Sequence, residues 1–109
     1  MAKRIEFDYD NRHWTLEFNA RTCKEVQLSG FKKDEIGDKS LVMLPLLFHG
    51  AFLMHHRGEK PSKIDEIFKL MGDKYNLYLK LIEMYEEPID ALTEEPEDES
   101  VKVNWTGNW

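Results

Sequence analysis

Residues 41–54 read LVMLPLLFHGAFLM, and only Pro45, His49 and Gly50 interrupt the apolar side chains of this stretch. A surface helix shows one apolar stripe, whereas a helix that is apolar all round must be covered all round. A chain of 109 residues has little material for such a cover. We therefore expect either the central helix of a small helical core or a helix whose uncovered surface contacts another subunit.

The same stretch is too short for a membrane span, which needs roughly 20 apolar residues. The first ten residues, MAKRIEFDYD, contain no apolar segment of the kind found in secretory signals. Cys23 has no second cysteine to pair with, and we interpret it as a small buried apolar side chain. These features predict a soluble intracellular protein with no membrane partner.

The charge is distributed unevenly along the chain. Eight of the 21 acids lie between Glu86 and Ser100, a stretch without Lys or Arg, which leaves 13 acids against 15 bases elsewhere. The acidity therefore belongs to the tail, and no basic stripe with interleaved aromatics indicates nucleic acid as a partner. With 41% hydrophobic residues, we predict a single folded domain over residues 1–92, followed by an acidic, Trp-ended flexible tail over residues 93–109.

The N-terminal part has the pattern of a β-hairpin. Apolar and polar residues alternate from Ile5 to Tyr9 and again from His13 to Phe18, on either side of a polar turn at residues 10–12. The shared apolar face carries four aromatic side chains and needs helices or further strands to cover it.

Helical patterns follow the hairpin. We expect a short helix capped by Thr22, a second from Leu41 or Leu44 to about residue 57, and a third and fourth capped by Ser62 and Asp73. Ser40 or Asp38 is expected to cap the second helix, and residues 31–39 are expected to form a polar loop. The predicted fold class is α+β, mostly α: an N-terminal β-hairpin and about four helices.

The motifs of catalysis and cofactor binding are absent from the sequence. It has no glycine-rich phosphate loop, no G-x-S-x-G and no Cys-x-x-Cys. His49, His55 and His56 are spaced by six and one, unlike the i, i+4 pair that a zinc site on a helix uses. We expect a protein that is not an enzyme and holds neither a metal nor a cofactor.

The tail has two interpretations at this point. Its acids can act as solubilising charge, or the segment can fold on a partner with Trp105 and Trp109 as anchors.

The order of these elements resembles a known family. The chain runs from a hairpin (IEFDYDNRHWTLEFNA) through a capped helix (RTCKEVQLSG) to an apolar helix with Pro and a Gly-Ala step (LVMLPLLFHGAFLMHH). It continues with PSKIDEIFKLMG, KYNLYLKLIEMYEEPIDAL and the acidic tail. This arrangement resembles the tail assembly chaperones of long-tailed bacteriophages, especially the small versions of Gram-positive phages and prophages.

The resemblance implies a non-enzymatic role in virion assembly. Such proteins bind and solubilise the tape measure protein, help to recruit the major tail protein, and self-associate into rings or short spirals. They act in the host bacterial cytoplasm, are not expected in the mature virion, and are often accompanied by a longer frameshifted form. We therefore expect partner or oligomer contacts at the following residues: Leu47, Phe48, Phe52, Tyr78, Ile82, Tyr85, Trp105 and Trp109.

Two alternatives remain open. The chain could be an acidic phage inhibitor that mimics nucleic acid, although the acids cluster in the tail rather than over the domain. It could also be a helical adaptor in a toxin–antitoxin or transcription complex, although no basic recognition helix is visible.

Overall fold

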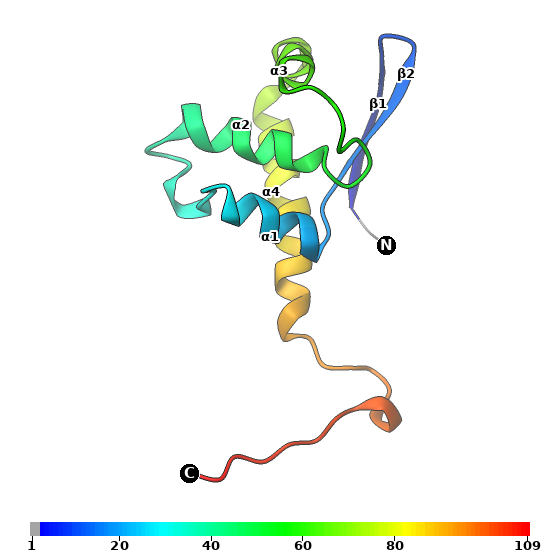
Figure 1. Cartoon of the computed structure of the whole chain (residues 1–109), viewed down its shortest axis with the longest axis vertical. Coiled ribbons are helices and arrows are strands. Elements are labelled where there is room, and N and C mark those ends of the chain that lie inside the picture. The colour runs from blue at the N-terminus through cyan, green and yellow to red at the C-terminus, as the bar shows by residue number, and fades with distance from the viewer. Residues whose placement is uncertain (1–2) are drawn as a thin grey trace.

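The computed structural model describes residues 3–109, and it has the predicted α+β fold: an antiparallel hairpin followed by four α-helices (Figure 1). α1 and α2 lie across α4, and the hairpin stands beside them. In chain order the elements are β1 (Arg4–Tyr9), β2 (Arg12–Glu17), α1 (Ala20–Leu28), α2 (Ser40–Ala51), α3 (Pro61–Leu70) and α4 (Lys74–Asp90). Single 3₁₀ turns are η1 (Lys33–Glu35), η2 (Ala91–Thr93) and η3 (Glu99–Val101).

The hairpin forms as its pattern predicts. Tyr9 pairs with Arg12 across a two-residue turn, in which Asp10 and Asn11 have φ of 57° and 59°. Two successive left-handed residues define a type I′ turn, whose twist matches that of the strands, and Asp and Asn tolerate this conformation. The apolar face of β2 enters the core, where Trp14 is completely buried and donates from Nε1 to the Tyr9 carbonyl at 3.0 Å.

The predicted cap of α1 is wrong by three residues. Asn19 is the N-cap: its side-chain oxygen accepts from the Thr22 amide at 2.8 Å, and Thr22 Oγ1 accepts from the Asn19 amide at 2.9 Å. Thr22 therefore takes part in a capping box, but as its third helical residue. Asn is among the residues most favoured at the N-cap, and Thr ranks below it.

The apolar run forms α2, which is shorter than predicted. The helix ends at Ala51, and the next residues turn so that His55 and His56 reach β2. Its N-cap is Lys39 without a side-chain bond, so the expected caps Ser40 and Asp38 are wrong. These hydrogen bonds between distant residues explain the early end, because local periodicity does not include them.

Of the two later helices, α3 begins differently from the prediction, whereas α4 has Asp73 at its N-cap as predicted. α3 starts with Pro61 in the first turn after Lys60, so Ser62 is not its cap. Asp73 precedes α4 in a left-handed conformation without a side-chain cap bond. Residues 31–39 are not a purely polar loop, because Phe31 and Ile36 are buried on either side of η1.

α2 is the centre of the core. It contacts α1, α3 and α4, and Leu47, Phe48 and Ala51 are completely buried. Its first turn extends beyond this cover, with Leu41 93% and Val42 55% exposed. The predicted incomplete cover of the apolar helix is thus found at its N-terminal end.

Within residues 3–109, no helix has the length and apolar character needed to cross a membrane.

Candidate functional site

Half of the predicted contact residues lie in the core of the single chain. Leu47, Phe48 and Phe52 are at most 1% exposed, and Tyr85 is 3% exposed. Tyr85 accepts at its hydroxyl from Gln27 Nε2 at 3.0 Å and packs edge-on against Phe18 and Phe31. These four side chains have no surface to offer a partner, because the fold of one chain already uses them.

The other half retain exposed surface. Tyr78 and Ile82 are half-buried on α4, and Trp105 and Trp109 in the tail are 78% and fully exposed. The tail runs away from the helices (Figure 1). The structure therefore places the candidates on two separate surfaces, one on α4 and one in the tail.

Tyr78 lies at the edge of an apolar groove between three helices. The groove has a volume of about 240 Å³ and is lined by Leu44 of α2, Phe68 of α3, and Lys74, Leu77, Tyr78 and Leu81 of α4. We call it the α2–α4 groove. It forms because Leu44 lies one turn before the fully buried Phe48, at the point where the cover of α2 ends.

Exposed apolar side chains continue this groove on both helices. Leu41 is three residues before Leu44 and therefore lies on the same face of α2. Along α4, Tyr75, Tyr78, Leu79 and Ile82 are spaced i, i+3, i+4 and i+7, which is one stripe. Tyr75 is 67% and Leu79 is 44% exposed. The groove and this stripe make a candidate surface for an apolar helix.

One charged side chain, Lys74, lines the groove. Lys74 donates from Nζ to the carbonyls of Lys69 and Met71, at 3.1 and 3.0 Å, and its ammonium lies 5.7 Å from the Phe68 ring centre. It thereby satisfies carbonyls at the end of α3 and closes one end of the groove. Farther along α4, Glu86 accepts from Lys33, and this hydrogen bond raises the pKa of Lys33.

The three neighbouring histidines point to three different partners. His49 Nε2 lies 2.7 Å from Asp65 Oδ1, and His55 Nε2 lies 2.8 Å from the buried Glu17 Oε1. His56 Nε2 accepts the backbone N–H of Thr15 at 3.0 Å. No cluster of three or more His, Cys, Asp or Glu in the described part of the chain is arranged to hold a metal ion. These histidines instead attach α2, α3 and β2 to one another.

The single cysteine lies beneath α4. Cys23 is 3% exposed, its Sγ lies 3.3 Å from the Tyr85 carbonyl, and burial raises the pKa of its thiol to about 11. A thiol that stays protonated is a poor nucleophile. This position makes Cys23 a packing residue.

The sequence profile described as "Domain of unknown function (DUF5055)" matches residues 1–109. The chain belongs to the DUF5055 family. Neither the curated proteins nor the solved structures gave a significant match. Within DUF5055, the geometry of the site is therefore the basis for any functional argument about this chain.

Sequence reasoning missed most of the groove in this DUF5055 chain. Of the residues that line the groove it identified Tyr78 alone. Of the apolar side chains that continue the groove it identified Ile82, but not Leu41, Tyr75 or Leu79. The signal was present in α4. There the stripe of Tyr75, Tyr78, Leu79 and Ile82 runs beside a buried series that includes Leu77, Leu81 and Met84. Leu41 could not be recognised from periodicity, because the whole of α2 is apolar.

Proposed function

We propose that this protein is a non-enzymatic tail assembly chaperone of a long-tailed phage or prophage. In this role it binds apolar helices of the tape measure protein, keeps them in solution, and helps to recruit the major tail protein in the host cytoplasm. The order of the elements, from hairpin to acidic tail, is the resemblance that supports the assignment.

The α2–α4 groove is the observation that carries the binding role. It is almost wholly apolar and is continued by the exposed Leu41, Tyr75 and Leu79. An amphipathic client helix presents side chains at i, i+3, i+4 and i+7, which such a groove accepts. Each Leu or Phe of the client that becomes fully buried contributes about 1.5–3 kcal/mol.

Self-association is the second part of the proposal. An apolar groove that is empty in the absence of client favours contact with another copy, which removes the same surface from water. The eight acids of residues 86–100 give each copy a like-charged segment that opposes unlimited association. Short closed assemblies are the expected result.

Co-expression with the tape measure protein tests the binding role. The variant Leu41→Asp, Tyr75→Asp places two charges at exposed positions beside the groove, so folding is preserved. The matched control is Leu28→Asp, which adds a charge at a 78% exposed leucine that does not line the groove. We expect the wild type and the control to keep the client in the soluble fraction. With the double variant we expect the amount of soluble client to fall at least about ten-fold. A client that is equally soluble with all three proteins, or with none, refutes the proposed role.

A further inference from the structure

The outer edge of β1 has unpaired backbone groups. In an antiparallel pair, hydrogen-bonded and non-hydrogen-bonded positions alternate. Tyr9 and Arg12 close the two-residue turn as a bonded pair, so Phe7–Trp14 and Ile5–Leu16 are bonded as well. The N–H and C=O groups of Glu6 and Asp8 therefore point away from β2, and they have no hydrogen-bond partner within residues 3–109.

The outer edge of β2 is protected. There the N–H of Thr15 donates to His56 Nε2 at 3.0 Å, so the segment after α2 covers this edge. An edge strand with free N–H and C=O groups is a template for another strand, and a two-stranded sheet is only marginally stable. Of the two edges, β1 is the one that can accept a third strand.

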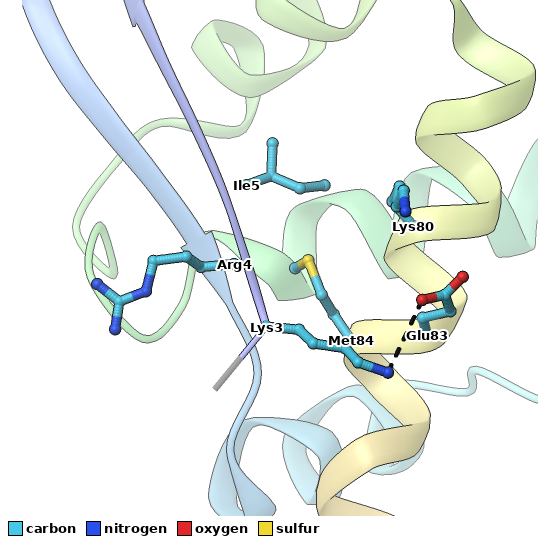
Figure 2. Close-up of a pocket in the computed structure, with 6 residues that line it drawn as sticks. All are labelled: Lys3, Arg4, Ile5, Lys80, Glu83 and Met84. Atoms are coloured by element: carbon cyan, nitrogen blue, oxygen red, sulfur yellow. Dashed lines mark ion pairs between the residues drawn. The ribbon is translucent and has the colours of Figure 1, made fainter. Parts of the chain in front are cut away.

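A pocket lies beside this edge, between β1 and α4 (Figure 2). It has a volume of about 320 Å³ and its wall includes Ile5 and Met84, while no residue of β2 lines it. Lys3 crosses its rim to Glu83 at 3.7 Å, and Arg4 points away from it. A strand added outside β1 would lay one large side chain over this pocket.

The chain itself contains a segment with the matching pattern. Val101, Val103 and Trp105 alternate with Lys102 and Asn104, and the three apolar side chains are 64–85% exposed. Such alternation is typical of a strand with one face to be buried. The solvent face of β1 carries Glu6 and Asp8, and Lys102 is the sole basic residue among residues 93–109.

We propose that residues 101–105 of a second copy add as an antiparallel third strand beside β1. With Val103 opposite Phe7, Trp105 lies opposite Ile5 and its indole covers the pocket at Met84. In the same register Lys102, which lies 3.3 Å from Glu95 in the single chain, comes beside Asp8. Backbone bonds thus supply affinity, and Trp105 and Lys102 fix the register.

Chain length disfavours the chain's own tail in this arrangement. Glu94 lines the same surface pocket as Lys3, the residue just before β1. Antiparallel addition requires Val101 to reach the other end of β1, near Tyr9. The seven steps from Glu94 to Val101 span at most about 24 Å, and β1 alone takes up about 20 Å. About 4 Å of reach is left for the sideways step and the reversal, so the chain's own tail would have to be almost fully extended, whereas the tail of another copy has no such limit.

Sedimentation velocity of the full chain over a range of concentrations tests the proposal. Glu6→Pro removes an N–H that points outward, so the bonds between β1 and β2 are retained while strand addition is blocked. Its control is Glu6→Gln, which keeps the N–H. We expect Glu6→Pro to weaken association at least about ten-fold and Glu6→Gln to leave it within about two-fold.

A second pair of variants does not depend on how the hairpin tolerates proline. Trp105→Ala removes the side chain assigned to the pocket, and Trp109→Ala removes a still more exposed tryptophan outside the added strand. We expect only the first to weaken association by about ten-fold or more. In a mixture of differently isotope-labelled chains, we expect intermolecular NMR contacts between Trp105 and Ile5.

Three results would overturn the proposal. They are a full chain that stays monomeric at about 1 mM, a Trp105→Ala variant that associates like the wild type, and a contact between Trp105 and Ile5 within one chain. A chain that stays monomeric would also refute the proposed self-association through the groove, whereas the other two results refute the strand addition alone. No client is present in these experiments, so none of these results bears on the proposed binding of tape measure helices. Likewise, loss of client binding by the Leu41→Asp, Tyr75→Asp variant leaves the strand addition untouched.

Discussion

α1 packs tightly against α2 at Gly50, and Gly50→Ala tests this packing directly. A methyl group built at Gly50 would lie 2.1 Å from Val26 Cγ2 and 3.3 Å from Phe18 Cε1. Val26 is 3% exposed and β-branched, so it cannot rotate out of the way. One of the two helices must shift.

Two opposing effects set the size of the loss. Overpacking a core typically costs about 1–3 kcal/mol, and replacing a mid-helix Gly by Ala recovers up to about 1 kcal/mol of helix propensity. We expect a net loss of about 1–2 kcal/mol in the free energy of unfolding, or a Tm lower by roughly 4–10 °C. Urea unfolding followed by circular dichroism measures it. The control is Gly58→Ala, where a methyl group would meet nothing within 4 Å.

A second substitution separates the close contact from other effects. Val26→Ala removes the methyl group that Gly50→Ala would strike, and by itself it costs about 2–3 kcal/mol. In the double variant the new methyl occupies part of the cavity. We expect the double variant to lose about 1–3 kcal/mol less than the two single losses added together. A Gly50→Ala protein as stable as the wild type, or losses that simply add, would refute the close packing of α1 on α2.

Three further predictions concern His56, Asn19 and Cys23. Burial lowers the pKa of His56. Its imidazole must be neutral to accept the Thr15 N–H, so the stability that this hydrogen bond contributes is present above about pH 6.5 and is lost as the pH falls. In urea unfolding, His56→Gln, which keeps an acceptor, should therefore lose less stability than the wild type between about pH 7.5 and 5.5; an identical pH dependence contradicts this. Asn19→Ala should cost about 1 kcal/mol by removing the α1 cap, and a Tm equal to that of the wild type would contradict it. Cys23 should react with a thiol reagent only after unfolding, so rapid labelling of the native protein would show that its burial is incomplete.

Local rules predicted the features of this fold that depend on neighbouring residues. The hairpin was predicted with its turn at residues 10–12, and the turn is Asp10-Asn11, of type I′, with Arg12 already in β2. In α3 the side chains of Ile64, Ile67 and Phe68 form an apolar stripe of helical spacing, and Met71 is the C-cap. The cap of α1 was predicted three residues too late because Thr22 and Glu25 match the capping-box pattern by themselves, whereas in the structure Asn19 is the N-cap and Thr22 its partner.

Contacts between residues far apart in the chain determine the end of α2 and the burial of Tyr85, which local sequence patterns do not predict. α2 ends at Ala51 because the next residues turn toward β2, where His55 meets the buried Glu17 and His56 meets Thr15. These partners are separated by about 40 residues along the chain. Likewise, Tyr85 and Tyr78 have similar positions in the α4 pattern. Contact with Phe18 and Phe31 buries Tyr85, whereas Tyr78 remains at the edge of the groove.

The exposed apolar surface at the N-terminal end of α2 follows from the length of that helix. Twelve residues of almost wholly apolar helix cross a body in which α1, α3 and α4 cover only the middle and the C-terminal part. Folding one chain therefore buries Leu47, Phe48 and Ala51 and leaves Leu41 and the side of Leu44 uncovered next to Tyr78. Leu41 is 93% exposed and contributes nothing to the core, so the stability of the single chain does not require an apolar residue at this position. An apolar residue at this position fits the proposal made above, in which a helix of the client covers it.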